Sequence, residues 1–118
     1  MMITAAMLTL IQNAGEAVLV LIDGLDEADF MRSRLTRHEV RRQLLALAGL
    51  LDGLSAPAQQ AMPEIDWPGW RHLALALHDA AAARDDSAWF AARALVPATL
   101  SWLRVYRQSE PALFEFTA

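Results

Sequence analysis

An arginine and a histidine, Arg71 and His78, lie seven positions apart in a stretch of helical composition, WPGWRHLALALHDAAAA. Since an α-helix has about 3.6 residues per turn, residues i and i+7 return to almost the same face. A histidine can transfer a proton near neutral pH, and an arginine offers a phosphate a planar fork of charged donors. The pair therefore indicates a ribonuclease site or the remains of one. The two residues would lie about 10 Å apart along the axis, at roughly 1.5 Å per residue, so a long arginine side chain closes part of that distance and a bound phosphate bridges the rest.

A second group of basic residues crowds into residues 32–42. Its members are Arg32, Arg34, Arg37, Arg41 and Arg42, with His38 among them, and the acids Asp23, Asp26, Glu27 and Asp29 come just before. One interpretation is a solvated helix face with local ion pairs. The other is a patch that faces RNA or a protein partner, with Arg37, Arg41 and Arg42 as the binding residues. The net charge of −4 argues against strong non-specific binding to nucleic acid.

Other kinds of catalytic site find little support. The chain has no cysteine, which excludes disulfides, a thiol nucleophile and cysteine-ligated metals. The three histidines lack the spacing of metal ligands, so we expect no metal and no cofactor. The four tryptophans could stack on RNA bases, but tryptophans on amphipathic helices more often fill a core.

The composition predicts one all-α domain over residues 1–118, with a C-terminal tail at about 108–118. The chain is 55% hydrophobic and has only five glycines and five prolines, and alanine and leucine dominate it. We expect an antiparallel up-and-down bundle of four to five helices. The expected elements are a helix over 3–22, a short helix over 26–32, a helix from Thr36 to about Leu54, a linker over 55–66, a helix over 67–83, and a last helix from Asp86 or Ser87 to about Arg107 that Pro97 interrupts and kinks.

The boundaries of these helices follow from capping residues. Gly24 is expected to end the first helix, and Asp26 to cap the second. The run Thr36-Arg37-His38-Glu39 fits a capping box, and Asp66 followed by Pro68 fits another helix start. Asp85-Asp86-Ser87 is expected to break the chain between the last two helices. The aromatic tail, with Leu113, Phe114 and Phe116, is expected to dock on the bundle or on a partner.

The first helix is apolar enough to be mistaken for a signal or a membrane span. It has no basic start, and it carries Gln12, Asn13 and Glu16 near its middle. A signal peptide has the opposite arrangement, and a spanning helix avoids such a polar cluster. We therefore expect a core or interface helix, no membrane and a cytoplasmic protein.

The order and spacing of several short motifs resemble the HepT-like branch of the HEPN superfamily over roughly residues 8–107. The motifs are Gly-Leu-Asp-Glu-x-x-Phe from Gly24 to Phe30, Arg34-Leu-Thr, Val40 with Leu44, Gly49 with Leu54, the lead-in Met62-Pro-Glu-Ile-Asp-Trp67, and the spacing of His78, Trp89, Pro97 and Leu100. The resemblance implies a small helical bundle that forms a homodimer. It also implies a toxin–antitoxin pairing with a minimal nucleotidyltransferase encoded nearby.

Toxins of that family are metal-independent ribonucleases in which four to six residues separate an arginine from the histidine that follows it. His78 matches the histidine, and Arg71 fits the loosest form of the motif. The departures are Leu73 and Ala74 at the usual arginine and asparagine positions, Ala80 where the family's nucleotidyltransferase modifies a tyrosine, and Leu50 at a helix-three glutamate. The missing tyrosine removes the family's acceptor for AMP.

Three functions remain open at this point. The first is a ribonuclease toxin that uses Arg71 and His78 from both protomers, with RNA held by the arginine group. The second is a catalytically inactive dimeric module that binds the nucleotidyltransferase. The third is a helical scaffold without such a partner.

Overall fold

The structure is a computed structural model that describes residues 3–115, and it is all-helical apart from one short strand pairing. The helices are α1 (Ala5–Ile22), α2 (Glu27–Arg32), α3 (Arg34–Asp52), α4 (Ala56–Ala61), α5 (Trp67–Ala76), α6 (Ala81–Phe90), a π-helical segment η1 (Ala91–Leu95), α7 (Val96–Ser109) and a 3-10 turn η2 (Pro111–Leu113). The all-α prediction is confirmed. The described residues contain more helices than the four to five expected, because α4 forms inside the expected linker and the π-helical segment η1 separates α6 from α7.

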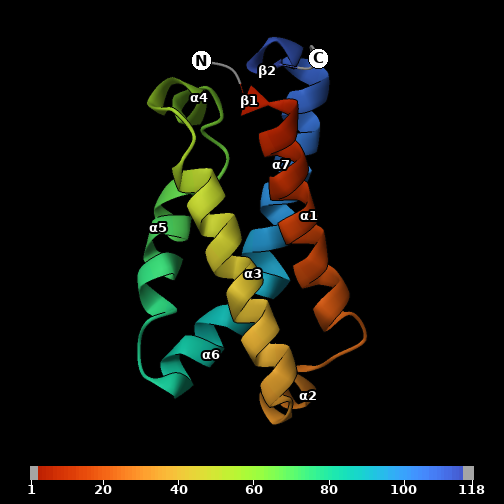
Figure 1. Ribbon diagram of the computed structural model, residues 1–118, viewed down its shortest axis with the longest axis vertical. Helices are drawn as coiled ribbons and strands as arrows, with labels where there is room; N and C mark the ends of the chain where they lie inside the picture. The colour runs from red at the N-terminus through yellow and green to blue at the C-terminus, as the bar shows by residue number, and fades with distance from the viewer. Residues whose placement is uncertain (1–2, 116–118) are drawn as a thin grey trace.

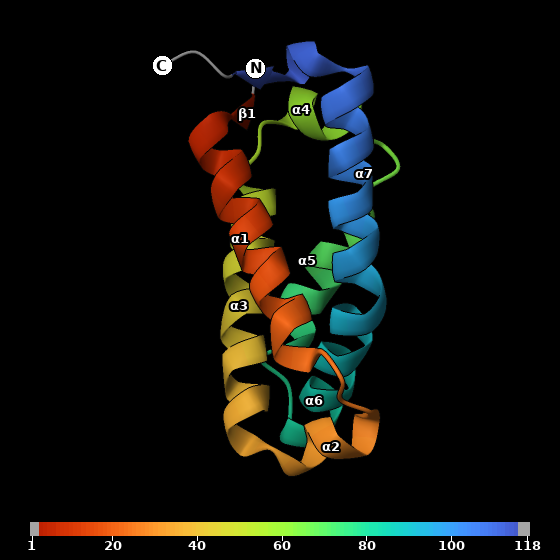
Figure 2. The same cartoon turned by 90° about the vertical axis from the view of Figure 1, so that its right-hand side faces the viewer.

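The long helices lie lengthwise, and the short ones close the two ends of the molecule (Figure 1). α1 packs most extensively against α3, and α7 lies against α1. Figure 2 shows α1 and α3 on one side and α7 on the other, with α5 and α6 between and behind them. At one end the strands β1 (Ile3–Thr4) and β2 (Phe114–Glu115) pair in parallel, which brings the start and end of the described chain together.

The core is formed by the apolar stripes of α1, α3, α5 and α7. Its fully buried large side chains include Ile11 and Val18 of α1, Leu44 and Leu47 of α3, and Leu103 of α7. Apolar residues recur every three or four positions along α3 and just beyond it, and Val40, Leu44, Leu47, Leu51 and Leu54 are all buried. α1 and α7 approach closely at Gly15, where an added Cβ would lie 2.8 Å from the Cδ2 of Leu100.

The first two helices begin and end largely as predicted. Gly24 has a φ of 75°, the left-handed conformation that glycine adopts without strain and that ends a helix. Asp26 caps α2 in a reciprocal box, because its carboxylate accepts from the Asp29 N–H at 2.7 Å while Asp29 accepts from the Asp26 N–H at 3.2 Å. These caps hold α2 at one end of the molecule, directly before α3.

The predicted start of α3 is wrong. Ser33, not Thr36, is the N-cap: its Oγ accepts the Thr36 N–H at 3.3 Å and donates to Thr36 Oγ1 at 2.8 Å. Thr36 is therefore already inside the helix, and the expected capping box does not form. α3 begins at Arg34, which adds one more arginine to its first turn.

The expected linker over 55–66 is also partly helical. Ser55 caps the short helix α4, which has Pro57 in its first turn. α4 buries Ala58, and Met62 just beyond it is fully buried. This segment therefore packs on the core, and Asp66 then caps α5 as predicted by accepting the Gly69 N–H at 2.9 Å.

The predicted helix over 67–83 is the main error. α5 ends at Ala76, the next residues form a turn, and α6 begins at Ala81, so Asp85, Asp86 and Ser87 lie inside a helix rather than at a break. The turn buries Leu77 completely, and the side chain of Arg41 donates from Nε to the Leu77 carbonyl at 3.0 Å. Tertiary burial and a hydrogen bond from another helix thus override an alanine-rich stretch with high helix propensity.

The last helix keeps a continuous path through Pro97. Proline has no N–H and cannot make one of the backbone bonds of a regular helix. The π-helical turns of η1 come directly before it, and Pro97 then lies in the first turn of α7. The expected interruption at Pro97 is therefore a short π-helical segment directly before the proline, where the helix is wider than an α-helix.

Most of the tryptophans fill the core, as expected. Trp67 Nε1 donates to the Met62 carbonyl at 2.9 Å, and Trp70 Nε1 donates to Thr99 Oγ1 at 2.9 Å. Trp89 is half-buried against Phe30, with ring centroids 5.1 Å apart. Trp102 is partly exposed. The tail docks through the buried Phe114, while Phe116 lies outside the described residues.

Candidate functional site

Arg71 and His78 do not share a helix. Arg71 is an exposed residue of α5, whereas His78 is exposed in the turn that follows it. The His78 N–H still donates to the Leu75 carbonyl at 3.1 Å, so the turn continues close to the end of α5. The prediction that both side chains project from one regular helical face is wrong, because that helix ends at Ala76.

Arg71 borders an apolar hollow of about 430 Å³ between α3 and α5. The hollow is lined by Leu45, Ala48, Gly49, Leu51, Asp52, Gln59, Trp67, Trp70, Arg71, Ala74 and Leu75. Arg71 and Asp52 are its charged residues, and His78 does not line it. The hollow therefore lacks the histidine that the motif pairs with an arginine.

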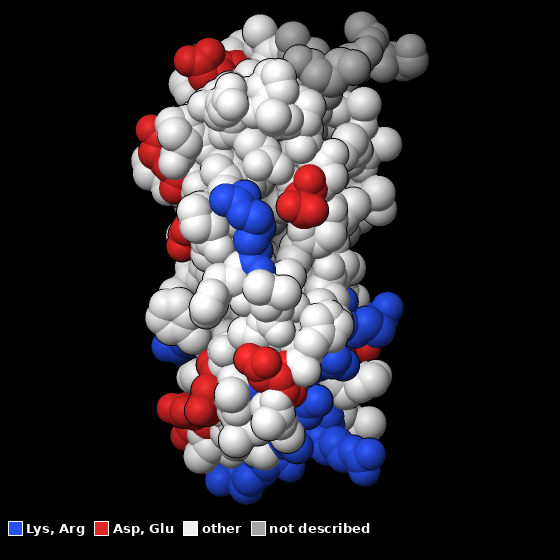
Figure 3. All heavy atoms as spheres, turned by 90° about the vertical axis from the view of Figure 1, so that its left-hand side faces the viewer, with Lys and Arg blue, Asp and Glu red and all other residues white. Residues whose placement is uncertain are grey.

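A second pocket, of about 290 Å³, gathers most of the arginine group (Figure 3). Its lining consists of Arg34, Arg37, His38 and Arg41 of α3 with Arg84 and Asp85 of α6. We call these six residues the basic pocket. Positions 34, 37, 38 and 41 follow the i, i+3, i+4, i+7 pattern, so they lie on one face of α3. α6 completes the pocket because it packs against that face.

The basic pocket is held in shape by hydrogen bonds to backbone and to one carboxylate. Arg37 donates to the carbonyls of Met31 and Phe30 at the end of α2, and its Nε lies 3.4 Å from Asp85 Oδ2. Arg84 pairs with the other oxygen of the same carboxylate, with Nε 3.4 Å from Asp85 Oδ1. Asp85 thus bridges two guanidinium groups, while Arg41 reaches across to the Leu77 carbonyl.

The hydrogen bonds of Arg41 and Arg84 within residues 3–115 use only Nε. Their terminal amino groups therefore remain for a ligand. Arg34 has no hydrogen bond or ion pair among the described residues, although its guanidinium borders the same pocket. Four arginines against one aspartate leave an excess of three positive charges in a chain whose net charge is −4.

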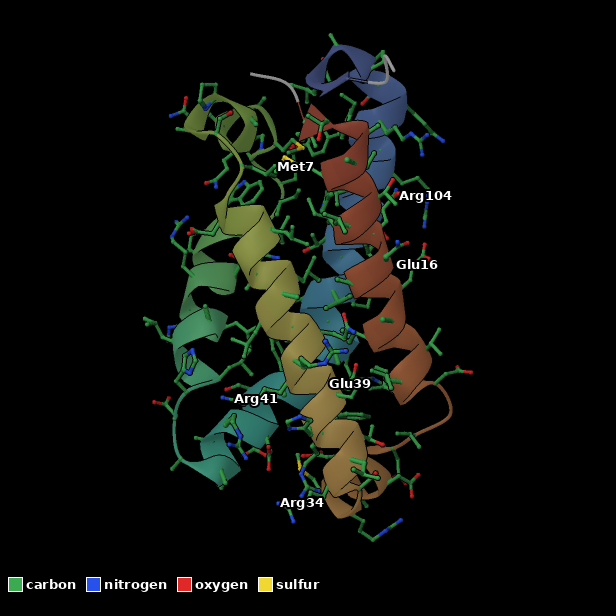
Figure 4. The ribbon with its side chains drawn as sticks, viewed as in Figure 1. Met7, Glu16, Arg34, Glu39, Arg41 and Arg104 are labelled. Atoms are coloured by element: carbon green, nitrogen blue, oxygen red, sulfur yellow. The ribbon has the colours of Figure 1, made fainter. Side chains whose placement is uncertain are left out.

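Arg42 does not belong to this pocket, although the sequence grouped it with Arg37 and Arg41. Its Nε donates to Glu39 Oε2 at 3.0 Å and its Nη2 to Glu39 Oε1 at 2.5 Å. The hydrogen bond from Arg42, together with one from Gln43, lowers the pKa of Glu39 to about 2, and Glu39 in turn raises the pKa of Arg42. Figure 4 shows Glu39 on the side of α3 opposite to Arg41.

The structure thus separates the residues that the sequence singled out. Arg37 and Arg41 come together in the basic pocket, Arg42 is paired elsewhere, and Arg71 borders the apolar hollow. Sequence reasoning missed Arg34 as a pocket residue, although its spacing from Arg37 and Arg41 was a usable signal. It also missed Arg84 and Asp85, which only the packing of α6 on α3 brings in.

His78 is connected to the basic pocket through its own turn. The turn that carries His78 also carries the Leu77 carbonyl to which Arg41 donates. The arginine that the structure brings to this turn is therefore Arg41 rather than Arg71. His38 lines the basic pocket, whereas His72 borders a different hollow between α5 and α6.

No cluster of three or more histidine or carboxylate side chains suited to a metal ion exists among residues 3–115. Comparisons of the chain with protein-family models, with curated proteins and with solved structures found no match. The likeness to HepT-like proteins therefore rests on the order and spacing of residues in the sequence.

Proposed function

We propose that this chain is a HepT-like component of a toxin–antitoxin pair, a dimeric HEPN protein that binds a minimal nucleotidyltransferase without cleaving RNA itself. Its helices then form the antiparallel up-and-down bundle of that superfamily. Support comes from the all-helical fold, from the Gly24 turn before an Asp26-capped helix, and from the buried Trp67 after the lead-in to α5.

One observation carries the choice of a binding module over a ribonuclease. Because α5 ends at Ala76, Arg71 and His78 lie on different elements, and Arg71 borders an apolar hollow that His78 does not reach. A phosphate held by Arg71 is thus not presented to His78 by one rigid helix, as the motif requires. Proton transfer depends on such fixed geometry.

A ribonuclease remains the second candidate, and the exposure of His78 favours it. In that case the arginine that holds the phosphate is either Arg41, which reaches the turn of His78 through its hydrogen bond to the Leu77 carbonyl, or Arg71 of the second protomer. RNA would lie over Arg37 and Arg41 in the basic pocket, as the sequence predicted.

Self-association is supported by large apolar side chains that remain exposed on several helices. They are Leu10, Val20, Leu35, Leu75, Phe90, Trp102 and Val105. The most exposed of them are Leu35, at 83%, and Val20, at 75%. A second copy of the chain and the nucleotidyltransferase are the partners that we propose for these side chains.

We also propose that the protein is cytoplasmic and binds no membrane. By length and composition, α1 is the one helix among the described residues that could cross a bilayer. Core helices of soluble proteins are often as long and as apolar as α1, and α1 packs its buried face on α3. Its exposed Asn13 and Glu16 also oppose insertion.

The test combines a binding measurement with a cleavage assay. The chain is co-expressed with the nucleotidyltransferase encoded beside it, and the mass of the purified complex is measured by light scattering. RNA cleavage and growth arrest are measured for the wild type, His78→Ala and the matched control His72→Ala. A stable complex of a dimer with the nucleotidyltransferase, without cleavage, is the expected result.

Two outcomes contradict the proposal. Cleavage that disappears in His78→Ala but persists in His72→Ala establishes the ribonuclease instead. A monomer that neither cleaves RNA nor binds the nucleotidyltransferase leaves only the helical scaffold.

A further inference from the structure

We infer that the basic pocket between α3 and α6 binds the diphosphate group of a small phosphorylated molecule. This inference concerns a site apart from Arg71 and His78, and it does not depend on the HepT-like assignment. It rests on the composition of the pocket, on the hydrogen bonds that orient its arginines, and on the charges around it.

The first argument is the match of charge. Arg34, Arg37, Arg41 and Arg84 face one carboxylate, Asp85, so the arginines exceed the carboxylate by three positive charges. A nucleoside diphosphate carries about three negative charges near pH 7, since the second ionisation of a terminal phosphate has a pKa of about 6. Guanidinium groups are well suited to phosphate oxygens because their planar donors bind two oxygens at once.

The second argument is that the pocket is built before a ligand arrives. Arg37 is fixed by the Phe30 and Met31 carbonyls and by Asp85, and its side chain is 23% exposed. Asp85, only 19% exposed, also orients Arg84. Such fixed donors lose little conformational entropy on binding.

The third argument is the number of donors still available. Arg41 and Arg84 commit only Nε to the protein, and Arg34 commits no donor among the described residues. Figure 4 shows Arg34 at the end of α3 next to α2, and Arg41 further along α3 on the side toward α6. The two residues lie on one face of α3 and are seven positions, or about two turns, apart. Two phosphate groups can therefore be contacted by arginines from both ends of the pocket.

A compact ligand fits this site better than a passing RNA strand. The pocket is a hollow of about 290 Å³ between two helices. Asp26, Glu27 and Asp86 line a separate hollow with Arg93, and red and blue atoms lie close together at this end of Figure 3. An RNA strand, with one negative charge per phosphate, would extend beyond the basic pocket over the surface of a chain whose net charge is −4.

The experiment is a calorimetric titration at constant ionic strength with inorganic pyrophosphate, inorganic phosphate, ADP and a short single-stranded RNA without terminal phosphates. One pyrophosphate is expected to bind per chain, at least about tenfold more tightly than phosphate, because the second phosphate adds charge-assisted hydrogen bonds. ADP is expected to bind comparably if the ligand is a nucleotide. Binding of pyrophosphate without ADP assigns the site to unsubstituted diphosphate instead.

Two arginines on the same helix provide a matched pair of variants. Arg34→Gln removes a pocket donor that has no other partner in the described structure, so it is expected to weaken pyrophosphate binding about tenfold while the protein stays folded. Arg42→Gln removes an equal charge from outside the pocket and is expected to leave the affinity unchanged within about twofold. Arg84→Gln, on α6, provides a second pocket variant, with folding checked by circular dichroism.

Three results overturn the inference. The first is no binding of pyrophosphate at millimolar concentration. The second is an equal loss of affinity in Arg34→Gln and Arg42→Gln, which indicates a diffuse charge effect. The third is RNA binding that is tighter than pyrophosphate binding and is lost in Arg34→Gln, which makes the pocket part of an RNA surface.

Discussion

The apolar hollow beside Arg71 and the basic pocket around Arg41 differ in what surrounds their arginines. Arg71 is exposed at the border of a hollow lined mostly by leucine, alanine and tryptophan. Arg41 lies among three other arginines and donates to the Leu77 carbonyl across two helices. Both arginines line a hollow between α3 and a neighbouring helix. Only Arg41 has other arginines beside it in that hollow.

The spacing of residues along the sequence and their proximity in the folded protein thus indicate different arginines as the functional one. Arg71 attracts attention because it precedes a histidine by seven positions. Arg41 is visible in the sequence only as one member of a basic run, because Arg84 and Asp85, which complete its pocket, come from α6, more than forty positions later. The turn at Leu77 lies between the two regions, since it ends α5 and also accepts the hydrogen bond of Arg41.

The largest effect is expected at that turn. Leu77→Ala removes a fully buried side chain and should lower the free energy of unfolding by about 2–5 kcal/mol. Leu75→Ala is the matched control, because Leu75 is 74% exposed and its loss should change stability by less than about 0.5 kcal/mol. Urea denaturation measures both. Equal effects would mean that residues 73–83 continue as one helix, with another face buried.

The next effect tests whether the hollow beside Arg71 is part of the core. Trp70→Phe removes the Nε1 donor that Thr99 Oγ1 accepts at 2.9 Å, in a buried setting. The loss should cost about 1–3 kcal/mol, because a buried hydroxyl keeps no partner for one of its lone pairs. Trp102→Phe, at a partly exposed position, should cost much less. If Trp70→Phe were neutral, the tryptophans would be available for stacking rather than committed to the core.

A smaller effect compares the two arginines directly. Arg41→Gln removes the part-buried hydrogen bond to the Leu77 carbonyl and should cost about 1 kcal/mol. Arg71→Gln should be close to neutral, since Arg71 is exposed and has no hydrogen bond or ion pair among the described residues. Thermal unfolding of the two variants in parallel gives the comparison. A larger loss of stability in Arg71→Gln than in Arg41→Gln would mean that Arg71, and not Arg41, makes the stabilising contact.

Much of the fold could be predicted from the sequence, because its signals are local. The buried seam of α3, the Gly24 turn and the Asp26 and Asp66 caps follow from periodicity and capping chemistry. The apolar tail is expected to dock on the bundle or on a partner, and Phe114 is buried on the bundle. The end of α5 could not be predicted, because no glycine or proline marks it. It depends on burial of Leu77 and on Arg41, which lies 36 positions earlier in the chain.

The candidate site was less predictable than the fold for the same reason. The face of α3 that carries Arg34, Arg37 and Arg41 is periodic and visible in the sequence. The contribution of Arg84 and Asp85 requires α6 to pack on that face. The removal of Arg42 from the group requires knowledge that Glu39 is its partner rather than a capping residue of α3.

The smallest effect concerns that ion pair and sharpens the boundary of the basic pocket. Hydrogen bonds from Arg42 and Gln43 lower the pKa of Glu39 from 4.5 to about 2. Because the folded-state pKa is lower than the unfolded one, the pair contributes stability above about pH 4.5 and loses it as the pH falls toward 2. The contribution is small, since the pair is exposed and solvent screens it.

Titration of the Glu39 carboxyl carbon by NMR tests this ion pair, with an expected midpoint near 2 in the wild type and a higher one in Arg42→Gln. Arg34→Gln should leave the midpoint almost unchanged, because Arg34 belongs to the pocket and not to this pair. A shift of the same size in both variants would mean that Glu39 senses the whole arginine group, and Arg42 would then have to be counted among the charges available to a ligand.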